Sequence, residues 1–202
     1  MIKIAVFASG NGSNAENIVR YFSGNKQFSV AIIVSNKPDA FVHQRASALK
    51  IPSFTFSKHD FLQGDSLLHL LEENEINFIV LAGFLLKFPE KIIAKYPNKI
   101  VNIHPALLPK YGGKGMYGEQ VHRAVLECGE KETGITIHYV NERYDEGEIV
   151  FQAKCAIPPH ADADMIASLV HKLEYRHFPK VIEKVMKKEF FGFEDSSNDV
   201  EN

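Results

Sequence analysis

The chain has 202 residues, of which 45% are hydrophobic and 24% are charged, a composition that suits one globular domain with a full core. Its 23 lysine and arginine residues nearly balance 25 aspartate and glutamate residues, so the sequence offers no basic surface for nucleic acid or an anionic membrane. No apolar run approaches the roughly 20 residues of a membrane-spanning helix, and the first ten residues lack the features of a signal peptide. We therefore expect a cytoplasmic protein that acts on small molecules.

The two cysteines predict free thiols. Cys128 and Cys155 are far apart in the sequence, and neither belongs to a CxxC pair or a histidine-rich segment. Zinc sites and disulfide frameworks need closer or repeated spacings. We expect neither a disulfide nor a bound metal.

The first four apolar runs are typical of strands inside a sheet. They cover residues 2–7, 30–34, 78–81 and 99–104, and helical periodicity occupies the segments between them. Such alternation predicts a largely parallel sheet covered by helices on both faces. Residues 133–140 and 148–157 then flank a polar turn and predict two antiparallel strands. The sequence thus predicts an α/β fold with a mixed, mostly parallel sheet.

The last quarter of the chain predicts one long amphipathic helix over residues 162–188. Asp162 or Asp164 can cap its start, and Pro179 inside it can kink it. Residues 194–202 contain four acidic residues, no basic residue and almost no apolar side chain, which predicts a disordered acidic tail. We expect one catalytic domain over residues 1–193, followed by this tail.

The segment VFASGNGSNAENIV joins the first strand to the first helix, where backbone N–H groups and the helix dipole favour an anion. Gly10 and Gly12 permit the dihedral angles and close approach that such a loop needs. The dinucleotide pattern GxGxxG is incomplete because Ala15 replaces its third glycine, and the Walker lysine is missing. A single phosphate is the more natural ligand of Gly12, Ser13 and Asn14. The alternative is a simple tight turn in which Ser13 or Asn14 caps the helix.

The segment IVNIHPALLPKYGG places polar side chains at the end of a buried strand. Pro105 cannot donate a ladder hydrogen bond, so we expect the strand to end at His104. Strand side chains repeat every two residues, which puts Asn102 and His104 on one face at the carboxyl end, where open α/β sheets bind ligands. An amide and an imidazole there can both donate to a developing oxyanion.

A carboxylate close to His104 would raise the pKa of its imidazole and favour the charged form. The polar turn NERYDEGEI supplies four candidates, which are Glu142, Asp145, Glu146 and Glu148. Spacing alone does not choose among them. The alternative is that this turn is only a solvated acidic hairpin.

Together these motifs resemble a known family. The segments SGNGSN, LAGFLLKFP, NIHPALLPKYGG, GITIHYV and YDEGEIVFQ occur in the order and approximate spacing of phosphoribosylglycinamide formyltransferases, folate-dependent enzymes of purine biosynthesis, from Met1 to about Lys188. The resemblance implies a single-domain formyltransferase-type fold. It also implies that Asn102, His104 and Asp145 are catalytic, and it suggests a cis peptide bond at Leu108–Pro109.

The resemblance further implies the two substrates, glycinamide ribonucleotide and the co-substrate 10-formyltetrahydrofolate, and requires no metal. The ribonucleotide-binding residues that it implies are Gly12, Ser13, Asn14, Ala15 and Glu16 in the first loop and Glu174 on the late helix, which contacts the ribose. The folate-binding residues that it implies are Leu85, Leu86, Lys87, Phe88, Asn102, Asn141 and Tyr144.

The chain departs from its relatives at three places. Leu86 replaces an arginine of many relatives, residues 57–68 give no match for a basic residue that reaches the folate tail in some, and residues 112–122 form a longer loop. Other hypotheses are a methionyl-tRNA formyltransferase, a formyltetrahydrofolate hydrolase and a catalytically silent binding protein. We expect the first to carry a further C-terminal domain and a basic surface, the second an extra N-terminal domain, and the third no intact Asn, His and Asp. Oligomeric state is left open.

Overall fold

The computed structural model describes residues 1–193, and the predicted acidic tail, residues 194–202, lies outside these described residues. One seven-stranded sheet organises the described part of the chain in the order β3-β2-β1-β4-β5-β6-β7. The first five strands pair in parallel, while β6 pairs antiparallel with both β5 and β7. The mixed, mostly parallel sheet predicted from the sequence is confirmed. The strands are β1 Ile2–Phe7, β2 Phe28–Ser35, β3 Ser53–Thr55, β4 Phe78–Leu81, β5 Ile100–His104, β6 Glu132–Tyr139 and β7 Ile149–Ala156.

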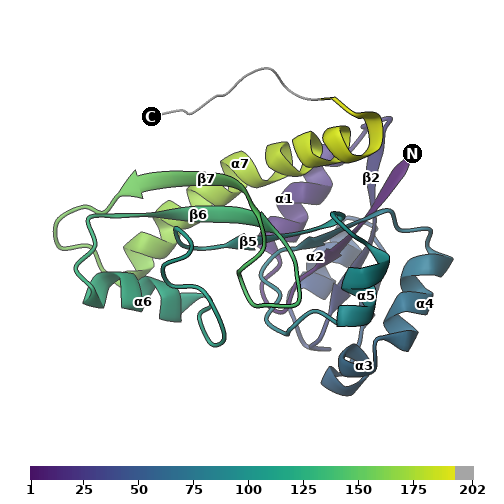
Figure 1. Ribbon diagram of the computed structural model, residues 1–202, viewed down its shortest axis with the longest axis horizontal. Helices are drawn as coiled ribbons and strands as arrows, with labels where there is room; N and C mark the ends of the chain where they lie inside the picture. The colour runs from purple at the N-terminus through teal and green to yellow at the C-terminus, as the bar shows by residue number, and fades with distance from the viewer. Residues whose placement is uncertain (194–202) are drawn as a thin grey trace.

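Helices cover both faces of the sheet (Figure 1). Side chains of α1, α2, α6 and α7 pack on one face, and those of α3, α4 and α5 pack on the other. This two-sided cover explains why most side chains of the parallel strands are apolar. The helices are α1 Ser13–Phe22, α2 Val42–Ala48, α3 Lys58–Gln63, α4 Asp65–Glu73, α5 Glu90–Lys95, α6 Glu119–Glu127 and α7 Ala163–Phe191.

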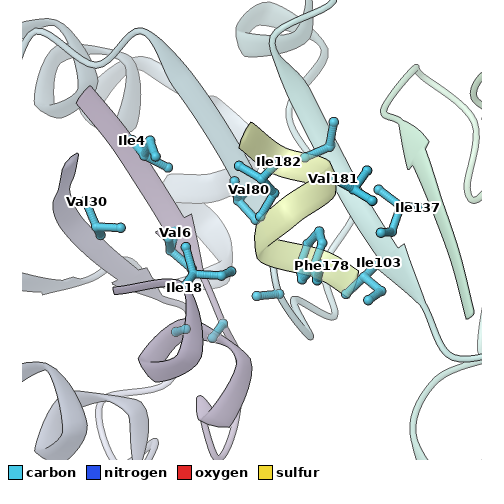
Figure 2. Packing of buried hydrophobic residues seen from close by; sticks show 14 of the residues in the cluster. Ile4, Val6, Ile18, Val30, Val80, Ile103, Ile137, Phe178, Val181 and Ile182 are labelled. Atoms are coloured by element: carbon cyan, nitrogen blue, oxygen red, sulfur yellow. The ribbon is translucent and has the colours of Figure 1, made fainter. Parts of the chain in front are cut away.

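The larger part of the core lies under α7. Figure 2 shows Phe178 and Ile182 of this helix against Val80, Ile103 and Ile137, which come from β4, β5 and β6. All five side chains are almost fully buried. Helix α7 thereby packs against both the parallel strands β4 and β5 and the antiparallel strand β6.

The predicted long helix is confirmed, and its boundaries have local causes. The Asp162 side chain accepts a hydrogen bond from the Met165 N–H at 2.8 Å, so Asp162 is the cap. The helix continues through the buried Pro179 and ends at Gly192, whose φ of 69° few other residues tolerate. The short strand β3 was not predicted, because three half-exposed residues leave no periodic pattern.

Candidate active site

Three parallel strands end side by side at the candidate site. Because β1, β4 and β5 are neighbours, the loops that follow their carboxyl ends meet at one edge of the sheet. Asn102 and His104 lie on β5 at this edge, and the strand ends at His104 as predicted. The Leu108–Pro109 peptide bond that follows is cis, also as predicted.

His104 is held by a backbone carbonyl on one side and faces a carboxylate on the other. Its Nε2 lies 2.7 Å from the Tyr111 carbonyl oxygen, and its Nδ1 lies 3.6 Å from Oδ2 of Asp145. A carbonyl oxygen only accepts hydrogen bonds, so Nε2 carries a proton. Nδ1 is therefore the ring atom that gains or loses a proton when His104 titrates, and it points toward Asp145.

Asp145 is the carboxylate that the fold brings to His104. Its side chain is 12% exposed, and its Oδ2 accepts a hydrogen bond from the Gly113 N–H at 2.9 Å. The other three candidates, Glu142, Glu146 and Glu148, are all exposed. Asp145 has a φ of 55°, a strained conformation for a residue with a side chain. The structure thus selects one of the four carboxylates that spacing left open.

Burial and the neighbouring carboxylate act on the charge of His104 in opposite directions. Burial lowers the pKa of His104 below its ordinary value, although Asp145 and the Tyr111 carbonyl act to raise it. Burial also acts to raise the pKa of Asp145, but His138, His104 and the Gly113 N–H together lower it. Asp145 thus acts on His104 in the predicted direction, and its role in keeping the imidazole charged during the reaction stays a prediction.

His138 belongs to the site, and the sequence analysis missed it. It lies opposite Asn102 in the β5–β6 register, with the Asn102 amide nitrogen 3.1 Å from its Nε2. Its Nδ1 lies 2.8 Å from the Tyr139 carbonyl and must carry the proton, which leaves Nε2 to accept from Asn102. The Asn102 amide nitrogen is also 3.5 Å from Asp145. Pairing GITIHYV in register with the strand before it would have revealed this contact.

A central cavity of about 320 Å³ opens on the three predicted catalytic residues. Asn102, His104 and Asp145 line it, together with Leu85 and the loop of residues 113–118. The longer loop noted in the sequence therefore forms part of the wall beside the three residues.

A second cavity of about 280 Å³ lies at the start of α1. Gly12, Ser13, Asn14 and Glu174 line it, as predicted for a phosphate and ribose site. Gly12 has a φ of 74°, and α1 begins without a side-chain cap within residues 1–193, so the predicted alternative of a capping Ser13 or Asn14 is wrong. The Asn14 amide donates to the buried Glu174 carboxylate at 2.8 Å.

Two residues predicted for this site do not line the cavity. Ala15 has its side chain in the core, so only its backbone N–H, unbonded within the helix, can reach a ligand. Glu16 donates its N–H to the Gly12 carbonyl, and its carboxylate pairs with Arg20 and Arg45. Arg45 in turn donates to the Asn11 carbonyl, so Glu16 holds the loop in place.

A smaller cavity of about 60 Å³ adjoins the central one. Residues from the loop after β4 and from the polar turn line it, and they include most of those predicted to bind folate. Leu85 instead lines the central cavity and the cavity at the start of α1. The predicted residues around the smaller cavity are Leu86, Lys87, Phe88, Asn102, Asn141 and Tyr144.

Within residues 1–193 no three His, Cys, Asp or Glu side chains are arranged so that they could hold a metal ion. In the same part of the chain, no helix combines the length and apolar character needed to cross a membrane. Cys128 and Cys155 are both free cysteines, as their spacing in the sequence predicted.

Comparison with known proteins identifies the family of this chain. The formyl transferase family matches residues 2–182. The chain is 40% identical to the phosphoribosylglycinamide formyltransferase of Bacillus subtilis (strain 168), over 92% of this chain and 95% of the relative. It is 36% identical to a chloroplastic phosphoribosylglycinamide formyltransferase of Arabidopsis thaliana, over 99% of this chain and 70% of the relative.

Solved structures give the same result. The phosphoribosylglycinamide formyltransferase of Streptococcus pneumoniae TIGR4 superposes with a TM-score of 0.80 at 33% identity, over 91% of this chain and 98% of that one. The enzyme from Bacillus halodurans gives a TM-score of 0.83 at 30% identity, over 93% and 96% of the two chains. The chain therefore belongs to the formyl transferase family, and within it to the phosphoribosylglycinamide formyltransferases.

Proposed function

We propose that this enzyme transfers the formyl group of 10-formyltetrahydrofolate to the amine of glycinamide ribonucleotide, and that Asn102, His104 and Asp145 carry the chemistry. The observation that supports the assignment is their convergence on one cavity between two others. The cavity at α1 offers helix N–H groups to a phosphate, and the smaller cavity offers apolar walls to a pterin.

The amine attacks the formyl carbon, and the carbonyl oxygen becomes an oxyanion. The Asn102 amide and the His104 imidazolium donate to this oxygen. Because burial disfavours the charged imidazole in the free enzyme, His104 takes up a proton from solvent as the oxyanion forms opposite Nδ1 and Asp145, and it returns that proton to solvent when the oxyanion collapses to the product carbonyl. Placing the charge where negative charge develops favours the transition state over the ground state.

The proton balance needs no metal. The attacking nitrogen carries an extra proton in the tetrahedral intermediate, and the leaving folate nitrogen must gain one before the carbon–nitrogen bond breaks. A water molecule held by Asp145 passes this proton between the two nitrogens. The products are the formylated ribonucleotide and tetrahydrofolate.

The test is a spectroscopic assay with 10-formyltetrahydrofolate and three conditions. Glycinamide ribonucleotide, charged initiator tRNA and no acceptor are compared under the same enzyme concentration. We expect turnover with the ribonucleotide alone. Turnover with tRNA would indicate a methionyl-tRNA formyltransferase, turnover without acceptor would indicate a hydrolase, and none in any condition would leave a binding protein.

Both substrates are small molecules, and we propose no nucleic-acid or membrane partner. A cytoplasmic location also stays a prediction. Because one relative is named as chloroplastic, cell fractionation with a specific antibody is the direct measurement.

A further inference from the structure

The cavity proposed to bind the phosphate is lined by few positively charged side chains. Its titratable lining residues are His122 on α6 and His171 and Glu174 on α7, and no lysine or arginine lines it in the described part of the chain. A ribonucleotide phosphate carries close to two negative charges at pH 7. Helix N–H groups stabilise such an anion but add no net charge to the cavity.

The nearest arginine of the loop is already engaged. Arg45 forms an ion pair with Glu16 and donates to both the carbonyl and the side chain of Asn11. Glu16 also pairs with Arg20, and neither arginine lines the cavity. Among the residues that line the cavity, only the two histidines can gain positive charge.

His122 is built into the cavity wall without a partner for one of its ring nitrogens. The residue is 3% exposed, and its Nδ1 has no hydrogen-bond partner among residues 1–193. An unpaired buried polar atom is costly and needs an explanation, and a ligand that completes the hydrogen bond supplies one. His122 is thus a second feature, independent of the α1 N-terminus, that points to a polar ligand.

The groups around His122 come from three elements. Glu119 of its own helix acts to raise its pKa, while His171 of α7 and His104 of β5 act to lower it. Glu174 of α7 lines the same cavity and is 4.0 Å from His171. Burial raises the pKa of Glu174, while the Asn14 hydrogen bond and His171 act to lower it.

We propose that binding of the ribonucleotide phosphate is coupled to proton uptake by His122 and His171, which together supply the positive charge that the cavity lacks. This inference rests on the proposed function for the identity of the ligand. It adds a positioning role for two residues outside the proposed catalytic set.

The proton uptake follows from the electrostatic effect of a bound phosphate on the imidazoles of His122 and His171. In the free protein, burial lowers the pKa of His122 to about 4, so its ring is neutral at pH 7. A dianion within a few ångström favours the charged form of both rings, and low dielectric around His122 strengthens that attraction. Proton uptake on binding requires that affinity for the phosphate falls as pH rises.

Isothermal titration calorimetry measures this coupling directly. Glycinamide ribonucleotide, ribose 5-phosphate and the unphosphorylated glycinamide riboside are titrated into the full-length protein at pH 7 in buffers of different ionisation enthalpy. We expect uptake of about one proton with each phosphorylated ligand and none with the riboside. The small monoanionic fraction of the phosphate contributes only about 0.1 proton in the opposite direction.

Substitutions of the two histidines show which side chain takes up the proton that calorimetry measures. We expect His122→Asn and His171→Gln each to remove about half of the uptake and to weaken ribose 5-phosphate binding about tenfold. Glu174→Gln tests the remaining titratable group of the cavity, and most of the uptake should persist in it. The matched control is His69→Gln, because His69 is an exposed histidine on α4.

The outcomes separate this inference from the proposed function. Ribonucleotide that is formylated and binds without proton uptake overturns the inference and leaves the function standing. Uptake that persists in both histidine variants, or that disappears in Glu174→Gln, also overturns it. Ribose 5-phosphate that binds with histidine-dependent uptake while no formyl transfer occurs supports the inference and rejects the function.

Discussion

Asn102 on β5 and His138 on β6 face each other across an antiparallel pair, and the amide nitrogen of the first lies 3.1 Å from Nε2 of the second. In the neutral ring, Nδ1 donates to the Tyr139 carbonyl and Nε2 accepts from the Asn102 amide, so His138 fixes which way that amide points. The amide of Asn102 is thereby aimed before any substrate arrives.

His138→Phe should lower kcat about tenfold with little change in either KM, since the Asn102 amide loses one buried hydrogen bond that orients it. Steady-state kinetics with both substrates is the measurement. His138→Gln, which keeps an acceptor, should recover part of the rate. Equal losses in the two variants would argue against an orienting role.

His104→Asn should lower kcat by about 10²-fold or more, because an amide donates a hydrogen bond but cannot become charged beside the oxyanion. Binding of glycinamide ribonucleotide, measured by calorimetry, should change far less. A variant with near-parental turnover would remove His104 from the chemistry.

Asp145→Asn should lower kcat at least about tenfold at pH 7.5, since a charge-assisted contact is lost. Asp145 acts to raise the pKa of His104, so its removal lowers that pKa further. A rate that needs the charged imidazole then declines at lower pH than in the parent. The pH–rate profile tests this.

The control for Asp145 is Glu142→Gln, in the same turn but exposed. We expect its profile to match the parent. A shift of similar size in both variants would mean that general charge in the turn, and not the contact with His104, sets the profile.

Gly12→Ala and Gly10→Ala form a matched pair in the first loop. A Cβ at Gly12 would lie 2.9 Å from the Val42 backbone at a φ of 74°, whereas a Cβ at Gly10 meets nothing within 4 Å. We expect Gly12→Ala to cost about 2 kcal/mol of unfolding free energy and to raise KM for the ribonucleotide several-fold. Folate affinity should be spared.

Urea unfolding and steady-state kinetics check the pair. Gly10→Ala should stay within about 0.5 kcal/mol of the parent. Equal effects at the two positions, or an equal loss of affinity for both substrates in a folded Gly12→Ala protein, would contradict a dedicated phosphate loop.

Glu174→Gln should raise the free energy of unfolding of the free protein at pH 8. It should also weaken the binding of glycinamide ribonucleotide. Burial raises the folded pKa of Glu174 above its unfolded value, so ionisation costs folding free energy above the unfolded pKa. The neutral amide removes that cost, and its advantage should vanish as the pH falls toward 4. Urea unfolding at pH 8 and pH 4.5 is the measurement, and a pH-independent difference would contradict the mechanism.

Local chemistry made much of the fold predictable. Unbroken apolar runs and helical periodicity identify the buried strands and the long helix over residues 162–188. Pro105 marks the end of β5, and the period of two places Asn102 and His104 on one face. These features depend on near neighbours in the chain, so one sequence suffices to find them.

The sequence by itself determined the α/β class, the glycine-containing loop between β1 and α1 and, through its motifs, the family. Tertiary structure decided what depends on distant parts of the chain: which of four carboxylates reaches His104, the facing of Asn102 and His138, and the sign of the His104 pKa shift. The physical reason is that strand register, burial and through-space fields arise only when segments about 40 residues apart pack together, and burial can then outweigh the carboxylate that spacing suggested.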